Sequence, residues 1–232
     1  FVGSFALMKR MALASDAISH VALPGLAIAM LLDINPLLGG LAALVAGAML
    51  IWLVERQTAI STETVIGVVF ATSLAIGALL TPAHELEEVL FGEITAPGLV
   101  EGIIGSLAAI AIGIILLTYK EKIVIAMVSS DLAKTLGLNV SRLNLLFLLL
   151  FSVNVLLGLR FLGVLLMGAL VIVPAAAAKN LARNLNADFI ISSLLAVISV
   201  VAGFLIASSY DLDLGPAVII AAAAIFILSM LV

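Results

Sequence analysis

Asp16 and His20 are the two residues whose types and spacing best suit metal chemistry in this sequence. They lie four residues apart in an apolar run, so an α-helix would place both side chains on one face. A carboxylate and an imidazole together suit borderline divalent cations such as Zn²⁺, Mn²⁺ or Fe²⁺. Two ligands are too few for a closed structural site, which suits a path that must release its ion. The alternative is a structural Asp–His hydrogen bond inside a helix bundle, and the residues alone favour neither interpretation.

The depth of this pair follows from the basic residues Lys9 and Arg10, which precede the apolar run. A helix rises about 1.5 Å per residue, so His20 would lie roughly 15 Å beyond them. That is about half of a hydrocarbon core roughly 30 Å thick. Ionisable groups at such a depth need partners or water, so we expect the rest of the chain to be a membrane scaffold that holds them.

The composition indicates a polytopic helical membrane protein. The chain is 65% hydrophobic and only 10% charged, whereas a soluble domain is about 25% charged. It has no cysteine, which excludes disulfides and thiol chemistry. The few, scattered basic residues do not favour nucleic-acid binding. The apolar residues ahead of Lys9 resemble the end of a spanning helix, so we expect the first span to be incomplete in this sequence.

Hydropathy predicts an all-α transmembrane bundle, a single membrane domain over residues 1–232, with about eight membrane segments. If each segment crosses once, nine of the ten basic residues fall on one side, which the positive-inside rule assigns to the cytoplasm. Only Arg160 falls outside. The segments are expected at 11–32, 37–54, 64–81, 99–118, 143–158, 161–178, 188–207 and 214–232.

The same topology places most acidic residues on the outer face. Among them, Glu93, Asp211 and Asp213 are the candidates for an outer mouth where metal ions arrive. The alternative is that these carboxylates belong to ordinary solvated loops.

A short cytoplasmic segment between the fourth and fifth spans has the pattern of a capped amphipathic helix. Ser130 suits the N-cap, Asp131 suits the positive end of the helix dipole and Gly137 suits the C′ position. Leu132 and Leu136 would share one face. Such a helix can rest on the lipid interface or dock a soluble partner, and sequence physics alone does not choose between them.

Enzymatic motifs are missing from the sequence. It contains no His-Glu-x-x-His, no Gly-x-Ser-x-Gly, no Gly-x-Gly-Asp and no phosphate-binding P-loop. The chain is therefore not expected to be an enzyme, and it is not expected to hydrolyse ATP itself.

The sequence resembles the permeases of zinc/manganese-type ABC importers. Residues 9–25 match that family's pattern of a basic pair, small and apolar residues, Asp, three residues, His and Leu-Pro-Gly. Three later stretches are similar in order: Leu-Phe-Gly at 90–92, Asp131-Leu132-Ala133 with Gly137, and Ala-Leu-Val-Ile-Val-Pro-Ala-Ala at 169–176. At 213–217 the family has an outer turn of the type Asp-x-Pro-x-Gly. In this sequence the Gly precedes the Pro, so the similarity is weaker there.

The resemblance implies a pair of permease copies, identical or not, in a prokaryotic plasma membrane. It implies ATP-binding cassette subunits docked on the cytoplasmic side at Asp131, Leu132, Ala133, Leu136 and Gly137, and a metal-binding protein docked outside. Asp16 and His20 would line the path of a transported Zn²⁺ or Mn²⁺, with no tightly bound cofactor. The alternatives are an ion-coupled secondary transporter acting without an ATPase, and a membrane scaffold that does not transport.

Overall fold

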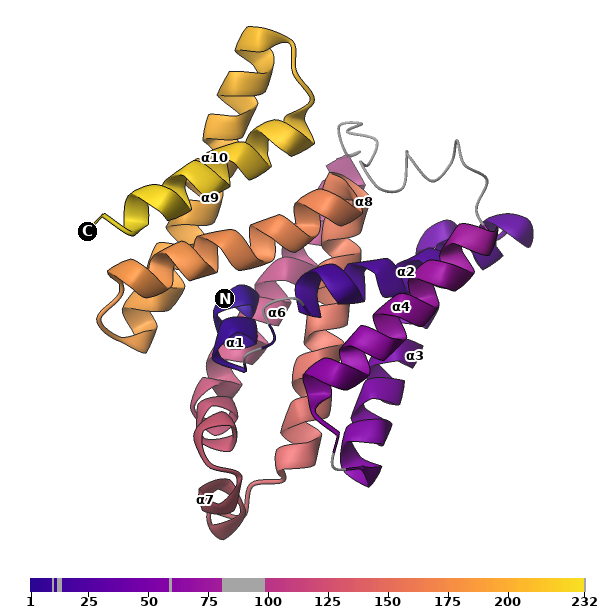
Figure 1. The fold of residues 1–232 in the computed structure, drawn as a ribbon, viewed down its shortest axis with the longest axis vertical. Helices are drawn as coiled ribbons and strands as arrows, with labels where there is room; N and C mark the ends of the chain where they lie inside the picture. Colours follow the sequence, from indigo (N-terminus) through magenta and orange to yellow (C-terminus); the bar gives the residue numbers. More distant parts are fainter. Residues whose placement is uncertain (10, 12–13, 59, 81–98, 232) are drawn as a thin grey trace.

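The computed structural model describes the backbone of residues 1–231 except 10, 12–13, 59 and 81–98. It describes the side chains of the same residues except 14–16, 99–101 and 160–165. Every regular element in the described part is a helix (Figure 1). The helices are α1 (Val2–Met8), α2 (Ala14–Leu31), α3 (Pro36–Gln57), α4 (Thr62–Leu80), α6 (Leu99–Val128), α7 (Ser130–Thr135), α8 (Val140–Leu181), α9 (Leu185–Tyr210) and α10 (Leu214–Ser229).

The predicted bundle of about eight apolar segments is confirmed. In the described residues, five helical segments are long and apolar enough to cross a membrane: 36–57, 62–80, 102–128, 140–159 and 185–210. Three shorter apolar helices cover 17–31, 166–181 and 214–229. Exposed leucine, isoleucine and valine side chains cover much of α6 and α9, as expected of helices that face lipid.

Helix α8 corrects one detail of the prediction. The two spans expected at 143–158 and 161–178 form one continuous helix of 42 residues. This helix turns sharply, as Figure 1 shows, and a Cβ atom built on Gly158 would lie only 1.9 Å from the Met167 sulfur. In a straight helix, nine residues advance about 13 Å, so the bend lies between these two positions.

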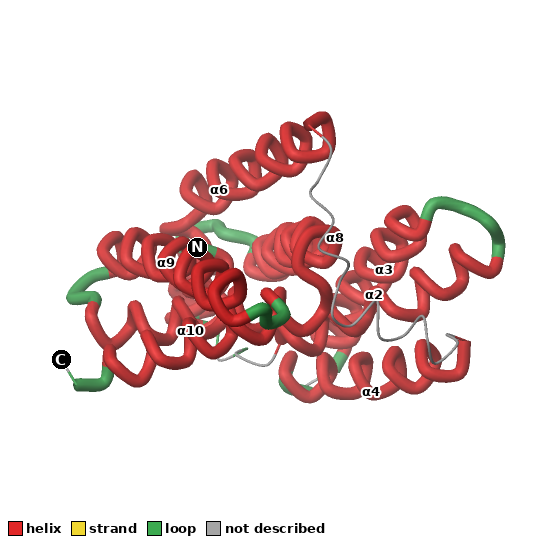
Figure 2. The backbone as a smooth tube through the Cα atoms, turned by 90° about the horizontal axis from the view of Figure 1, so that it is seen from above, coloured by secondary structure: helices red, strands yellow, loops and turns green. Residues whose placement is uncertain are grey.

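The bent helix α8 joins two groups of helices. Helices α2, α3 and α4 pack on one another, and α2 and α3 also pack on α8. Helices α9 and α10 pack on each other and on α8. Seen from above in Figure 2, the two groups lie on opposite sides of α8, and α6 packs on α8 from a third side. The bundle therefore has α8 as its central element.

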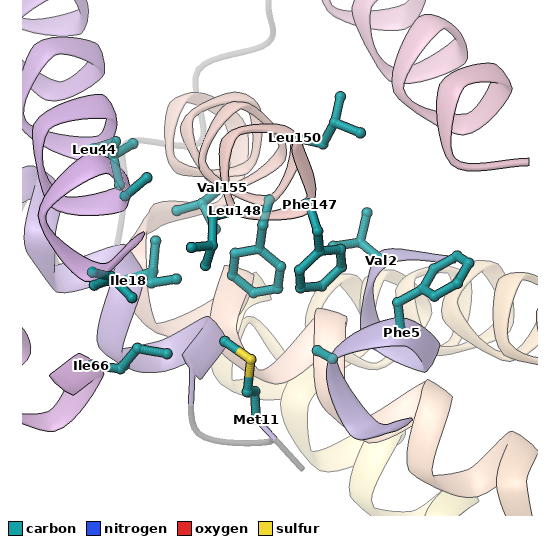
Figure 3. Close-up of a cluster of buried hydrophobic side chains, with 14 of the residues drawn as sticks. Val2, Phe5, Met11, Ile18, Leu44, Ile66, Phe147, Leu148, Leu150 and Val155 are labelled. Carbon is teal, nitrogen blue, oxygen red and sulfur yellow. The ribbon is translucent and has the colours of Figure 1, made fainter. Parts of the chain in front are cut away.

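The hydrophobic core joins residues of α1, α2, α3, α4, α6 and α9 with residues of α8 (Figure 3). Phe5 and Phe147 are fully buried, with ring centroids 6.4 Å apart. Phe189 packs against Phe5 at 5.0 Å, and Phe151 packs against Phe147 at 5.8 Å. Edge-to-face and tilted pairs of this kind stabilise a core beyond the area they bury. This aromatic group attaches the short helix α1 to both α8 and α9.

Asparagine side chains start three of the long helices. Asn35, Asn139 and Asn184 each accept a hydrogen bond from a backbone N–H of the first turn of α3, α8 and α9. Asparagine is among the preferred N-cap residues because its side-chain oxygen satisfies one of the unpaired N–H groups there. The short polar turns therefore mark where each apolar helix begins.

Candidate functional site

Helix α2 carries both predicted metal ligands, and it lies inside the bundle between α3, α4 and α8. Asp16 and His20 are one turn apart on this helix, so they share a face as predicted. The Asp16 side chain lies outside the described part. His20 is only 8% exposed, and its ring packs against Phe70 of α4 with centroids 5.3 Å apart. The imidazole is therefore buried and packed against an aromatic ring.

Glycines set the position of α2 against its neighbours. A Cβ atom on Gly25 would lie 2.1 Å from the Gly39 carbonyl oxygen, and one on Gly39 would lie 2.1 Å from the Gly25 carbonyl oxygen. The backbones of α2 and α3 therefore touch at this crossing, which only glycine at both positions allows. Gly25, the last residue of the family motif at 9–25, therefore has a packing role.

Pro24 lies inside α2, one residue before the crossing. A proline has no N–H to donate to the carbonyl four residues earlier, which here belongs to His20. The helix nevertheless continues to Leu31. The regular helical hydrogen bond from residue 24 to the carbonyl of residue 20 is therefore not formed, close to the point where α2 meets α3.

The number of available ligands limits what one chain can hold. Among the residues that the structure describes, no group of three or more His, Asp or Glu side chains is placed to hold a metal ion. A structural zinc site has four ligands. Asp16 and His20 would therefore supply only part of a coordination shell, which suits a transient site more than a structural one.

The amphipathic segment at 129–139 forms helix α7, with one correction. The N-cap is Ser129, whose hydroxyl accepts from the Leu132 N–H at 3.2 Å, and not Ser130 as predicted. Asp131 lies in the first turn and pairs with Lys134 at 3.3 Å. Gly137 follows the helix with φ of +74°, the left-handed conformation predicted for its C′ position.

The two faces of α7 differ in the way that a docking helix requires. Ala133 is completely buried against the rest of the chain. Leu132 and Leu136, one and three residues from Ala133, are 51% and 58% exposed. These leucines form an apolar surface on a short helix that projects from the bundle (Figure 1).

The structure describes two of the three candidate acidic residues of the outer mouth. Asp211 ends α9 in the left-handed conformation, with φ of 53°, and Asp213 is the N-cap residue of α10. Both are exposed and belong to the tight turn between these helices. Glu93 lies outside the described residues. The proposed outer mouth stays a prediction.

Sequence reasoning missed a polar cluster where α3 and α8 meet. The Asn144 side-chain amide donates to both carboxylate oxygens of Glu55, and the Trp52 indole N–H donates to the carbonyl and hydroxyl of Ser141, each at 2.9 Å. These pairs are 89 residues apart in sequence, so no local spacing reveals them. The sequence signal for this cluster is Asn144, an asparagine inside an apolar run.

Lys9 lies next to this cluster and is unusually buried for a lysine. Its ammonium nitrogen lies 5.3 Å from the centre of the Phe147 ring and has no hydrogen-bond partner among the described residues. Burial lowers the pKa of Lys9 to about 8, and the nearby Glu55 carboxylate opposes this shift. The first residue of the predicted basic pair is therefore packed inside the protein.

Comparison with known proteins identifies the family. The model of the ABC 3 transport family matches residues 1–232. The chain belongs to the ABC 3 transport family. This ABC 3 chain is 31% identical to the manganese transport system membrane protein MntC of Listeria monocytogenes, over 99% of this chain and 84% of that protein. It is 27% identical to the high-affinity zinc uptake system membrane protein ZnuB of Haemophilus influenzae, over 99% and 90%.

A solved structure has the same fold. The structure of PsaBC from Streptococcus pneumoniae in complex with Fab matches with a TM-score of 0.84 and 27% identity, covering 99% of this chain and 84% of that one. The predicted resemblance to ABC importer permeases is thereby confirmed. So is the predicted location, because the chain is a multi-pass protein of a family found in prokaryotic plasma membranes. The ABC 3 chain is a transport subunit.

Proposed function

We propose that this ABC 3 chain is the membrane permease subunit of an ATP-driven importer of a divalent transition metal, Zn²⁺ or Mn²⁺. The observation that carries the proposal is the Asp16–His20 pair on α2, a helix held inside the bundle by its glycine contact with α3. The related proteins named for zinc uptake and for manganese transport support the same class of cargo. A carboxylate with an imidazole suits either ion.

The transported ion requires more ligands than the described residues of one chain bring together. If His20 turns from Phe70 toward a second permease copy that presents the same face of α2, two carboxylates and two imidazoles come together. Four ligands match the usual coordination of Zn²⁺, and a site shared between two chains can open when they move apart. The metal is then held briefly at membrane depth, and no tightly bound cofactor is needed.

The remaining partners would dock on the two membrane faces of the bundle. The sequence contains no P-loop, so a separate ATP-binding cassette subunit would hydrolyse ATP. Its docking surface would include the exposed Leu132 and Leu136 of α7. A metal-binding protein would deliver the ion on the opposite side, near Asp211, Asp213 and Glu93.

Metal uptake into proteoliposomes tests the proposal. The permease is reconstituted with candidate ATPase and binding-protein subunits, with and without ATP, as wild type, Asp16→Asn and His20→Ala. We expect ATP-dependent uptake in wild type and its loss in both variants, with folded protein retained. Ile28→Val, which shortens an exposed side chain of the same helix, is the matched control and should transport normally.

Each alternative result has a clear meaning. Uptake that does not need ATP would replace this proposal with an ion-coupled secondary transporter. Normal uptake in His20→Ala would show that the pair on α2 is not the metal site. Loss of uptake in Ile28→Val as well would show that any change in α2 stops transport and that the loss in the Asp16 and His20 variants is not specific to metal binding.

Co-purification with the ATPase subunit tests the role of α7. Covering an exposed leucine contributes roughly 1–2 kcal/mol, so replacing both Leu132 and Leu136 with Asp should release the subunit. The control is Glu121→Gln with Lys122→Gln, which removes two exposed charges of α6 and leaves α7 unchanged. An ATPase that remains bound to the double aspartate variant would exclude α7 as the docking helix.

A further inference from the structure

A groove of about 230 Å³ lies where α1 meets the turn between α8 and α9. Two cations line it: Lys179 in the last turn of α8 and Arg183 in the turn itself. One carboxylate, Asp188, also lines it, so the lining carries one excess positive charge. None of these residues belongs to the α2 site or to α7.

The start of α9 adds backbone donors to the same groove. Asn184 is its N-cap, and the Asn184 side chain occupies the Ala187 N–H at 2.8 Å. The earlier N–H groups of the first turn, on Leu185 and Asn186, have no acceptor within a helix. The N-terminus of a 26-residue helix beside two cations is a favourable place for a phosphate group.

Most of the remaining lining is apolar. Leu7 and Met8 of α1 line the groove together with Ala175, which lies one turn before Lys179 on α8. One helical turn rises about 5.4 Å. Apolar side chains therefore lie close to the two cations, which suits an anionic headgroup together with the start of an acyl chain.

The groove lies at the level where the basic residues gather. Lys120 of α6 donates a hydrogen bond to Asn186 at 3.1 Å, and Lys9 directly follows Met8 in sequence. The positive-inside rule assigns this end of the bundle to the cytoplasm. The cytoplasmic leaflet carries the anionic lipids, and basic pockets between membrane helices bind their headgroups.

We propose that this groove binds an anionic phospholipid of the cytoplasmic leaflet. Lys179, Arg183 and the first N–H groups of α9 contact the phosphate, and Leu7, Met8 and Ala175 contact the start of an acyl chain. The bound lipid fills the junction between α1, α8 and α9. The inference is independent of the cargo and goes beyond the proposed transport function.

Calorimetric titration of the purified permease in neutral detergent tests this site. The probes are short-chain phosphatidylglycerol, short-chain phosphatidylcholine and inorganic phosphate. We expect phosphatidylglycerol to bind more tightly than the other two. Each basic residue near an anionic group contributes a factor of about five, so Lys179→Gln with Arg183→Gln should weaken binding roughly 30-fold.

Three variants separate the groove from general surface charge. Lys122→Gln with Lys134→Gln removes two cations outside the groove and should leave binding unchanged. Ala182→Leu keeps both cations but fills the groove, so it should weaken binding of phosphatidylglycerol. Asp188→Asn removes the one carboxylate and should strengthen binding about fivefold.

The opposite results would overturn the proposal. Equal loss in the Lys122/Lys134 variant, or full binding in Ala182→Leu, would show that lipid binds to surface charge and not in the groove. Equal affinity for inorganic phosphate and phosphatidylglycerol would identify a soluble phosphate compound as the ligand. Gel filtration of each variant, with the wild-type elution volume expected, shows that the fold is retained.

Discussion

Replacing Gly25 with alanine tests how α2, which carries the candidate metal pair, is held against α3. The new Cβ atom would lie 2.1 Å from the Gly39 carbonyl oxygen, more than 1 Å short of the 3.4 Å at which ordinary contact begins. The atom it meets is backbone, so no side-chain rotation relieves the overlap. The two helices must separate by about 1 Å or deform.

The expected cost follows from two opposing effects. Overpacking of a well-packed site costs about 1–3 kcal/mol. Alanine in place of glycine inside a helix raises the free energy of unfolding by about 1 kcal/mol. The net loss is therefore roughly 1–2 kcal/mol, and α2 moves relative to the Phe70 ring that contacts His20.

Thermal unfolding in detergent and metal uptake in proteoliposomes measure the two consequences. Gly25→Ala should unfold several degrees below wild type and transport more slowly. Gly67→Ala is the matched control, because a Cβ atom there meets nothing within 4 Å, and it should be neutral or slightly stabilising. The double variant Gly25→Ala with Gly39→Ala should lose less than the sum of the single changes, because the first one already separates the helices.

The reasoning would be refuted by one result in particular. If Gly25→Ala unfolds at the same temperature as wild type and as Gly67→Ala, the two backbones do not touch at this crossing. The packing role of the Leu-Pro-Gly end of the motif would then be wrong.

Three further predictions concern the cytoplasmic end. Trp52→Phe removes the indole N–H that bonds to Ser141, and it should lower the free energy of unfolding by about 1 kcal/mol in denaturant titrations, with Trp52→Ala costing more. Gly137→Ala forces a left-handed alanine, which costs about 1–2 kcal/mol, so hydrogen exchange should quicken in α7 alone; unchanged exchange would contradict this. Lys9→Met should stabilise the fold by about 1–2 kcal/mol at pH 7, because the folded chain holds that proton less tightly than the unfolded one. This advantage should shrink between pH 8 and 10.5, and a constant difference in melting temperature would show that the buried charge is not its cause.

The predicted parts of the fold are those governed by local pattern. Long apolar runs specify spanning helices because backbone groups in lipid must be satisfied within the segment. The left-handed Gly137 was predicted because glycine tolerates that conformation. The N-cap was misplaced by one residue because Ser129 and Ser130 are equally good caps, and only the backbone geometry selects Ser129.

The missed parts depend on contacts between distant segments. Asn144 and Glu55 lie on different helices, and nothing near either residue indicates the other. Two spans were predicted around Gly158 because the apolar pattern is interrupted there, whereas the helix continues through the bend. The shared face of Asp16 and His20 follows from spacing alone, but the burial of the imidazole against Phe70 required the fold.

The continuous helix α8 has a mechanical consequence. A helix backbone is stiff, whereas a loop between two spans would absorb their relative movement. Because α8 runs unbroken from the segment after α7 to the turn before α9, a push at its first turn is carried around the corner into the α9–α10 pair. If the angle of the bend is fixed, rotation of the part of α8 before the bend also moves the part after it. The two halves of the permease therefore move together, or the corner near Gly158 changes its angle.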